Sequence, residues 1–180
     1  AAALLSAERT ALNFLQLLSA VATKTAQYVE AVRGTRAQIV DTRKTLPGLR
    51  LAQKYAVRMG GGTNHRLGLY DAVLIKENHI AAAGGIAPVL ARVAALAPRA
   101  RFVQIEVETL EQLREALAGG AAMVLLDNMD LPTLHQAVAM NAQWAQQRGG
   151  EPAILEISGG VTLAGLRELA QTGVDRISIG

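Results

Sequence analysis

Short apolar runs alternate along the chain with segments whose apolar residues recur at helical spacing. The runs predict strands near residues 38–41, 72–75, 102–106, 122–126, 153–157 and 175–179. Helical segments fall between them near 49–59, 86–96, 109–118, 130–147 and 162–171, and a longer one covers 6–33, with Gly34 as its candidate C-terminal cap. The pattern therefore predicts an α/β fold.

This order of elements determines how the strands run. Strands that alternate with helices are parallel, and their connections are right-handed crossovers. About six such units favour a (β/α) barrel over an open doubly wound sheet, and six strands leave the barrel open or incomplete. We expect one α/β-barrel domain over residues 1–180, with 1–34 as leading helices. Its active site is expected where the carboxyl ends of the strands meet.

Composition narrows the function classes. The chain is 51% hydrophobic but only 3% aromatic, so its core must consist of aliphatic residues, which suits helices packed on parallel strands. The net charge is +3, yet the cations are scattered without interleaved aromatics, which argues against nucleic-acid binding. No apolar run reaches the roughly 18 residues of a membrane span, and no signal peptide is evident. The absence of cysteine excludes disulfides and thiolate metal sites and favours a cytoplasmic protein.

Cations gather after the first two predicted strands. Arg43 and Lys44 follow the first strand, three consecutive glycines precede His65 and Arg66, and Lys76 follows the second strand. An isolated Arg-Lys pair is usually a solvated loop, but the glycine-rich segment allows the backbone close to a ligand. Converging cations repel one another unless an anion lies among them. The cluster therefore predicts a dianionic substrate.

Carboxylates follow the next two strands. Glu106 and Asp127 end successive strands, where they can bind Mg²⁺ together with substrate phosphates or accept hydrogen bonds from ribose. The alternative is that such carboxylates cap the following helices, as expected for Glu108. Both interpretations remain open from the pattern alone.

Small residues follow the last two strands. The segment Ser158-Gly159-Gly160 precedes a helix, and Gly180 follows the final strand. Such residues expose backbone N–H groups near a helix N-terminus, and late barrel loops commonly bind phosphate. These loops are candidate phosphate sites.

Taken together, these strings resemble the quinolinate phosphoribosyltransferase family, also called nicotinate-nucleotide pyrophosphorylase (carboxylating). The matching segments are ERTALN at 8–13, DTRKT at 41–45, NHR at 64–66, IKENH at 75–79, EVE at 106–108, LDN at 126–128 and SGG at 158–160. The resemblance covers essentially the whole chain. It implies phosphoribosyl transfer from phosphoribosyl pyrophosphate to quinolinate with decarboxylation, giving nicotinate mononucleotide for NAD synthesis.

The resemblance also implies roles for individual residues. Substrate-binding positions correspond to Arg9, Arg43, Lys44, His65, Arg66, Lys76, Glu106, Asp127, Ser158, Gly159, Gly160 and Gly180. Among these, Lys44, Lys76, Glu106 and Asp127 are the expected catalytic residues, and Glu106 and Asp127 the expected Mg²⁺ ligands. Arg9 matches an arginine presented to the partner subunit's site, which implies a homodimer.

Members of the family carry a smaller N-terminal domain and a C-terminal tail to which nothing in this sequence corresponds, so we expect this chain alone to be weakly active or inactive. Other hypotheses are a relative acting on another anionic base, a molybdate-uptake accessory protein, a Schiff-base aldolase using Lys76, and a non-catalytic binding module.

Overall fold

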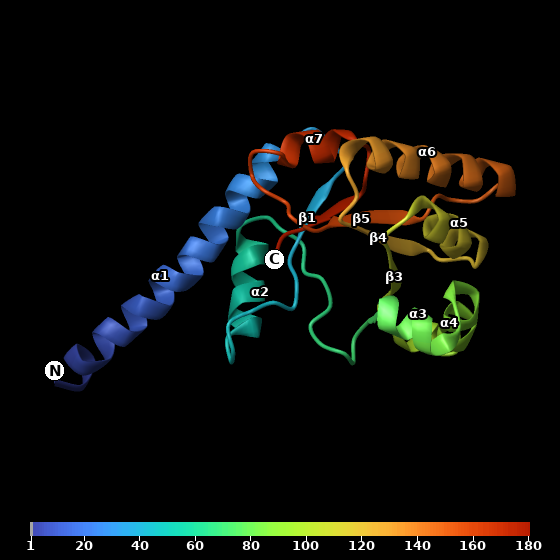
Figure 1. Ribbon diagram of the computed structural model, residues 1–180. Helices are drawn as coiled ribbons and strands as arrows, with labels where there is room; N and C mark the ends of the chain where they lie inside the picture. The colour runs from blue at the N-terminus through green and yellow to red at the C-terminus, as the bar shows by residue number, and fades with distance from the viewer. Residues whose placement is uncertain (1) are drawn as a thin grey trace.

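A computed structural model describes residues 2–180 (Figure 1). The strands are β1 (Gln38–Val40), β2 (Val73–Ile75), β3 (Val103–Val107), β4 (Met123–Asp127), β5 (Ile154–Ser158) and β6 (Arg176–Ser178). The helices are α1 (Ala2–Ala31), α2 (Arg50–Met59), α3 (Glu77–Ala83), α4 (Ile86–Val93), the short 3-10 turn η1 (Ala97–Arg99), α5 (Leu110–Ala118), α6 (Leu131–Arg148) and α7 (Leu166–Gln171). All six predicted strands are confirmed to within a residue or two, and α3 is an element that the pattern did not predict.

The six strands form one parallel sheet in the order β1-β6-β5-β4-β3-β2. From β2 to β6 each strand lies beside its successor, and the first strand lies beside the last. A doubly wound sheet would instead reverse its order partway. The predicted barrel-like α/β class is therefore confirmed, and the barrel is open, because β1 and β2 occupy the two edges of the sheet.

The segment after α2 lies along the free edge of β1. Thr63 forms a parallel bridge with Val40, donates its backbone N–H to the Ile39 carbonyl at 2.8 Å and accepts from the Asp41 N–H at 3.1 Å. The preceding glycines serve this packing: a Cβ on Gly60 would lie 2.4 Å from the carbonyl oxygen of Ala22 in α1. The glycine-rich segment therefore allows a close approach to a helix, and Gly61 within it adopts a positive φ of +86°.

The two faces of the sheet differ in polarity. Residues two apart on a strand, and residues paired across neighbouring strands, share a face. The outer face is apolar and packs against α4 to α7, with Ile39, Ile75, Ile105, Val124, Leu126, Leu155, Ile157 and Ile177 buried on it (Figure 1). We call the opposite face the inner face; it carries Gln104, Glu106, Glu156, Arg176 and Ser178.

Helix α1 packs only through its C-terminal half. Thr25 and Tyr28 are its buried residues, whereas Leu12 and Leu15, expected to form part of its apolar stripe, are 37% and 62% exposed. Figure 1 shows the N-terminal half projecting away from the sheet. Within the described residues, no helix is long and apolar enough to cross a bilayer.

Candidate active site

Two arginines of the predicted cation cluster lie near each other. Arg66 is buried, with 8% of its surface exposed, and its guanidinium has a long contact of 3.5 Å from Nη1 to the carbonyl of Ala72. Burial and then the charge of Arg43 lower the pKa of Arg66, while Asp71 raises it. The Arg43 Nε is also buried without a hydrogen-bond partner among the described residues. Two guanidinium groups in this state form a site that favours an anion.

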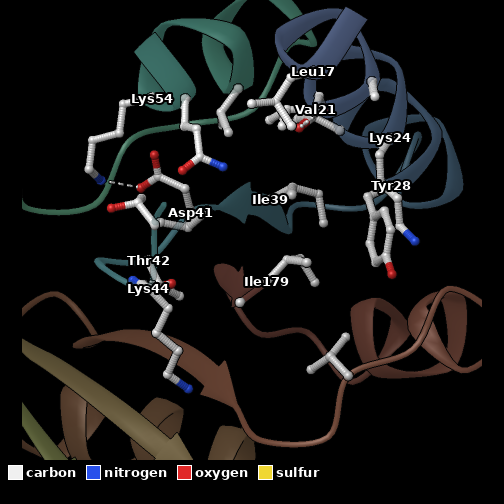
Figure 2. A pocket seen from close by; sticks show the side chains of 18 residues that line it. Leu17, Val21, Lys24, Tyr28, Ile39, Asp41, Thr42, Lys44, Lys54 and Ile179 are labelled. Atoms are coloured by element: carbon white, nitrogen blue, oxygen red, sulfur yellow. Dashed lines mark hydrogen bonds and ion pairs between the residues drawn. The ribbon is translucent and has the colours of Figure 1, made fainter. Parts of the chain in front are cut away.

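A buried ion pair holds the segment that carries these cations. Lys54 on α2 donates to Asp41 Oδ1 at 2.5 Å, as Figure 2 shows, and to the His65 carbonyl at 3.2 Å. The other Asp41 oxygen accepts from Asn64 Nδ2 at 2.7 Å. Asp41 and Lys54 are 8% and 2% exposed, so this pairing is shielded from water. The sequence did not identify Lys54 as a site residue, because a lysine within a helix is normally exposed to solvent.

The side chain of His65, in the segment after α2, packs against the inner face of the sheet. Its Nδ1 accepts the Arg66 backbone N–H at 2.8 Å, and its Nε2 lies 2.8 Å from Gln104 Oε1 on β3. The ring stacks edge-on against Phe102 with centroids 5.0 Å apart. Burial lowers the pKa of His65, and the nearby Glu156 charge opposes that effect. The ring is therefore neutral near pH 7.

Lys76 and Glu106 form an ion pair at the carboxyl ends of β2 and β3. The Lys76 ammonium donates to both carboxylate oxygens of Glu106, at 2.9 and 2.6 Å. Lys76 also precedes α3, and its backbone N–H donates to the ring Nδ1 of His79 at 3.0 Å. The lysine side chain is 47% exposed, so an incoming anion can reach it.

Asp127 lies beside the predicted phosphate loop. It pairs with Ser158 in the sheet, and one of its oxygens accepts from Asn128 Nδ2 at 3.0 Å. Gly159 has a φ of +97°, and a Cβ there would lie 2.1 Å from the Asn128 side-chain oxygen. Only glycine permits this contact. Asp127 does not cap the next helix; Asp130 does, just as Thr109 takes the capping role expected of Glu108.

The carboxylates suit a magnesium ion shared with a substrate. Glu106 pairs with Leu125, so it shares the inner face with Asp127. Within residues 2–180 no three His, Cys, Asp or Glu side chains form a group able to hold a metal by themselves. Mg²⁺ commonly uses one or two carboxylates and completes its shell with water and phosphate oxygens. The donor set fits that mode and not a protein-only cage.

Of the remaining predicted residues, Lys44 and Gly180 lie together beside a cavity, and Arg9 lies elsewhere. Lys44 lies close to Gly180, since a Cβ on that glycine would lie 3.6 Å from Lys44 Cδ. Both border a cavity of about 470 Å³ between α1, α2 and the end of β1 (Figure 2). Leu17, Val21 and Tyr28 form its apolar side. Arg9, by contrast, lies in the N-terminal half of α1 and is exposed.

Known proteins resemble this chain over nearly its whole length. The nicotinate-nucleotide pyrophosphorylase (carboxylating) of Mycobacterium leprae is 49% identical over 98% of this chain and 60% of its own length. A probable enzyme of the same name from Bacillus subtilis is 45% identical over 100% of this chain and 60% of its own length. The solved nicotinate-nucleotide pyrophosphorylase from Francisella tularensis superimposes with a TM-score of 0.89 at 46% identity, covering 98% of this chain and 60% of that one.

The chain thus spans 60% of the length of these relatives. The family described as quinolinate phosphoribosyl transferase, C-terminal domain, matches residues 21–180. That range includes every candidate site residue except Arg9. The chain therefore belongs to the quinolinate phosphoribosyl transferase family, whose C-terminal domain it contains.

Proposed function

We propose that the protein transfers a phosphoribosyl group from phosphoribosyl pyrophosphate to quinolinate, with loss of the 2-carboxylate as carbon dioxide. The observation that carries this proposal is the adjacency of Arg43 and buried Arg66, whose charges repel each other without an anion. Quinolinate brings two neighbouring carboxylates to such a site. The printed names of the M. leprae and B. subtilis relatives support the same reaction.

The cations have separate roles in this proposal. Arg43, Arg66 and Lys76 bind the dicarboxylate, because planar guanidinium groups match carboxylates and an ammonium adds a point charge. His65 belongs to this group by resemblance. Lys44 lies beside Gly180, where it stabilises the departing pyrophosphate at the junction of the two substrates. Holding both anions in line supplies much of the rate acceleration.

The first step forms one bond and breaks another. The pyridine nitrogen donates its electron pair to the anomeric carbon of the ribose, and the bond from that carbon to pyrophosphate breaks with the pair leaving on oxygen. Positive charge develops on the ribosyl carbon in the transition state, and the inner-face carboxylates stabilise it. In the second step the bond to the 2-carboxylate breaks, its electrons pass to the positive ring, and the ring carbon takes a proton.

The phosphate groups and the metal are assigned to the other strand ends. Backbone N–H groups of the loop 158–160 and Gly180 bind the ribose phosphate. Glu106 and Asp127 would hold Mg²⁺, which would neutralise charge on the pyrophosphate. Arg9 would reach the site of a second copy in a homodimer, and its exposure on α1 supports that role.

The transfer assay uses quinolinate labelled at the 2-carboxylate, with phosphoribosyl pyrophosphate and Mg²⁺. We expect labelled carbon dioxide and nicotinate mononucleotide in equal amounts above an enzyme-free blank. Lys44→Ala should remove both products, and Arg58→Ala, which deletes an exposed arginine of α2, should retain them. Because this chain alone is expected to be weakly active or inactive, failure to bind quinolinate, or product formed without release of the labelled carboxylate, would contradict the proposal.

The Schiff-base alternative is not favoured by the structure. Lys76 donates to both Glu106 oxygens, which is the arrangement of a charged ammonium and not of a free amine nucleophile. Borohydride treatment with a carbonyl substrate should therefore leave the mass of the protein unchanged. A covalent adduct at Lys76 would instead support the aldolase hypothesis.

A further inference from the structure

Helix α2 presents three polar side chains to the segments that carry the cation cluster. Arg50, Gln53 and Lys54 stand at positions i, i+3 and i+4, so they share one face of the helix. Lys54 bonds to the carboxylate at the end of β1. Gln53 Oε1 accepts the backbone N–H of Leu46 at 2.6 Å. This face of α2 therefore holds the loop after β1, and Arg50 is its first residue.

The guanidinium of Arg50 bonds to both segments that carry a site arginine. Its Nη2 donates to the carbonyl of Arg43 at 3.2 Å. Its Nη1 donates to the carbonyl of Leu67, the residue after Arg66, at 3.3 Å. Its Nε donates to the Thr45 hydroxyl at 3.2 Å. One planar group thus links the backbone of the loop after β1 to that of the segment after α2.

The charge of Arg50 has no carboxylate partner. Within the part of the chain that the structure describes, its side chain forms no ion pair, and its three hydrogen bonds go to neutral oxygens. A third cation near Arg43 and Arg66 increases the repulsion in the empty site. The guanidinium offers donors in fixed directions, which a flexible ammonium does not. Its value to the fold therefore lies in the geometry of its donors and not in its charge.

Arg50 and Lys54 hold the same two segments at successive points. Lys54 bonds to Asp41 in one segment and to the His65 carbonyl in the other. Arg50 bonds to the carbonyl two residues further along each segment. Arg66 thus lies between the two held residues of its segment. Without Arg50, each segment would be held by α2 at fewer points, and the distance between the two site arginines could change.

We propose that Arg50 is a positioning residue that sets the spacing of the Arg43 and Arg66 guanidinium groups to that of two adjacent carboxylates. It acts through the carbonyls of Arg43 and Leu67, so it determines specificity through the backbone. The link between the two segments is a property of the free protein, whereas the identity of the dicarboxylate rests on the proposed function. Without the link the two arginines, which repel each other, move apart, and the site loses its preference for adjacent carboxylates.

The link is tested first in the free protein, by amide hydrogen exchange of Arg50→Lys and Arg50→Gln. The N–H groups of Thr45 and Leu67 are hydrogen-bonded within the two held segments, so their exchange reports on both. We expect both amides to exchange at least about tenfold faster in either variant, with the amides of β4 unchanged. Arg58→Gln removes an exposed arginine from the same helix and should exchange like the unsubstituted chain. Unchanged exchange at Thr45 and Leu67 would overturn the proposal.

Specificity is tested by calorimetric titration of the same proteins with quinolinate and with lutidinate, an isomer whose two carboxylates are not adjacent on the pyridine ring. The unsubstituted chain and Arg58→Gln should bind quinolinate more tightly than lutidinate. Both Arg50 variants should bind quinolinate about tenfold more weakly, while lutidinate affinity changes by less than about threefold. The preference for adjacent carboxylates should therefore decrease.

The possible outcomes separate positioning from the alternatives. Equal loss of both affinities would indicate a merely structural role and contradict the proposal. Full affinity and selectivity in Arg50→Lys, with loss in Arg50→Gln, would show that only the charge matters, and would also contradict it. Faster exchange in the variants, combined with no quinolinate binding by the unsubstituted chain, would support the link between the segments and contradict the proposed function.

Discussion

Two lysine–carboxylate pairs lie at opposite edges of the sheet, one at the end of β1 and one at the ends of β2 and β3, and they differ in their surroundings. The side chains of Lys54 and Asp41 are 3% and 9% exposed, and those of Lys76 and Glu106 are 47% and 12% exposed. The first pair organises backbone, because it also binds the His65 N–H and carbonyl. Among the described residues, the side chains of the second pair are hydrogen-bonded only to each other, across β2 and β3. The buried pair is therefore structural, whereas Lys76 of the exposed pair can leave Glu106 and bind an anionic ligand instead.

Breaking the buried pair should have the largest effect. Lys54→Met would leave the Asp41 carboxylate buried without its cation, which typically costs about 3–5 kcal/mol in the free energy of unfolding. Lys76→Met is the matched control and should cost no more than about 1 kcal/mol, because water screens an exposed pair. Urea unfolding followed by circular dichroism measures both. Equal losses for the two variants would show that burial does not distinguish the pairs.

Acid should affect the buried region through His65. Its folded pKa is lowered, chiefly by burial, from an unfolded value of about 6.5. As the pH falls below about 6.5 the unfolded chain therefore binds a proton that the folded chain does not, and stability decreases by at most about 1.4 kcal/mol per pH unit. Unfolding curves between pH 8 and pH 5, compared with His65→Gln, measure this contribution.

The variant should show a flatter pH dependence over that range. Above the unfolded pKa both states are neutral at this residue, so the two proteins should then show the same slope. If the free energy of unfolding falls equally steeply with acid below about pH 6.5 in His65→Gln and in the unsubstituted chain, protonation of His65 does not contribute to the pH dependence.

The exposed pair should show the smallest effect, with the opposite sign. Glu106→Gln removes the anion that competes for the Lys76 ammonium, so quinolinate should bind up to about fivefold more tightly without Mg²⁺ or phosphoribosyl pyrophosphate. Glu108→Gln makes the same charge change at an exposed residue nearby and serves as the control. Calorimetry measures both affinities. Weaker binding in Glu106→Gln alone would show that the carboxylate supports the dicarboxylate site.

Much of the fold could be predicted because its signals are local. Most strands lie in short stretches rich in apolar residues and end at a polar or glycine residue, and polar residues within β3 and β5, such as Gln104 and Glu156, do not remove their strand character. Helix α3 was missed because it starts directly after β2 and has only one large apolar residue, Ile80, in its seven positions. Short elements of this kind carry too little periodicity.

The charged residues at the strand ends of the candidate site could be predicted, whereas the buried residues that hold them could not. Cations and carboxylates at strand ends stand out because strand ends are expected to meet. Lys54, Gln104 and Glu156 do not stand out, because a buried polar residue depends on partners distant in sequence, such as Asp41, His65 and Arg176. Pairings of this kind appear only when the sheet register is known.

The most direct measurement is a calorimetric titration of the chain with quinolinate, beside Arg66→Ala and Arg58→Ala. Both variants lose one arginine, but only Arg66 is buried next to Arg43. We predict that the unsubstituted chain and Arg58→Ala bind quinolinate with the same affinity, and that Arg66→Ala does not bind measurably. Equal binding by all three proteins, or binding by none, would contradict the assignment of this arginine pair to the dicarboxylate.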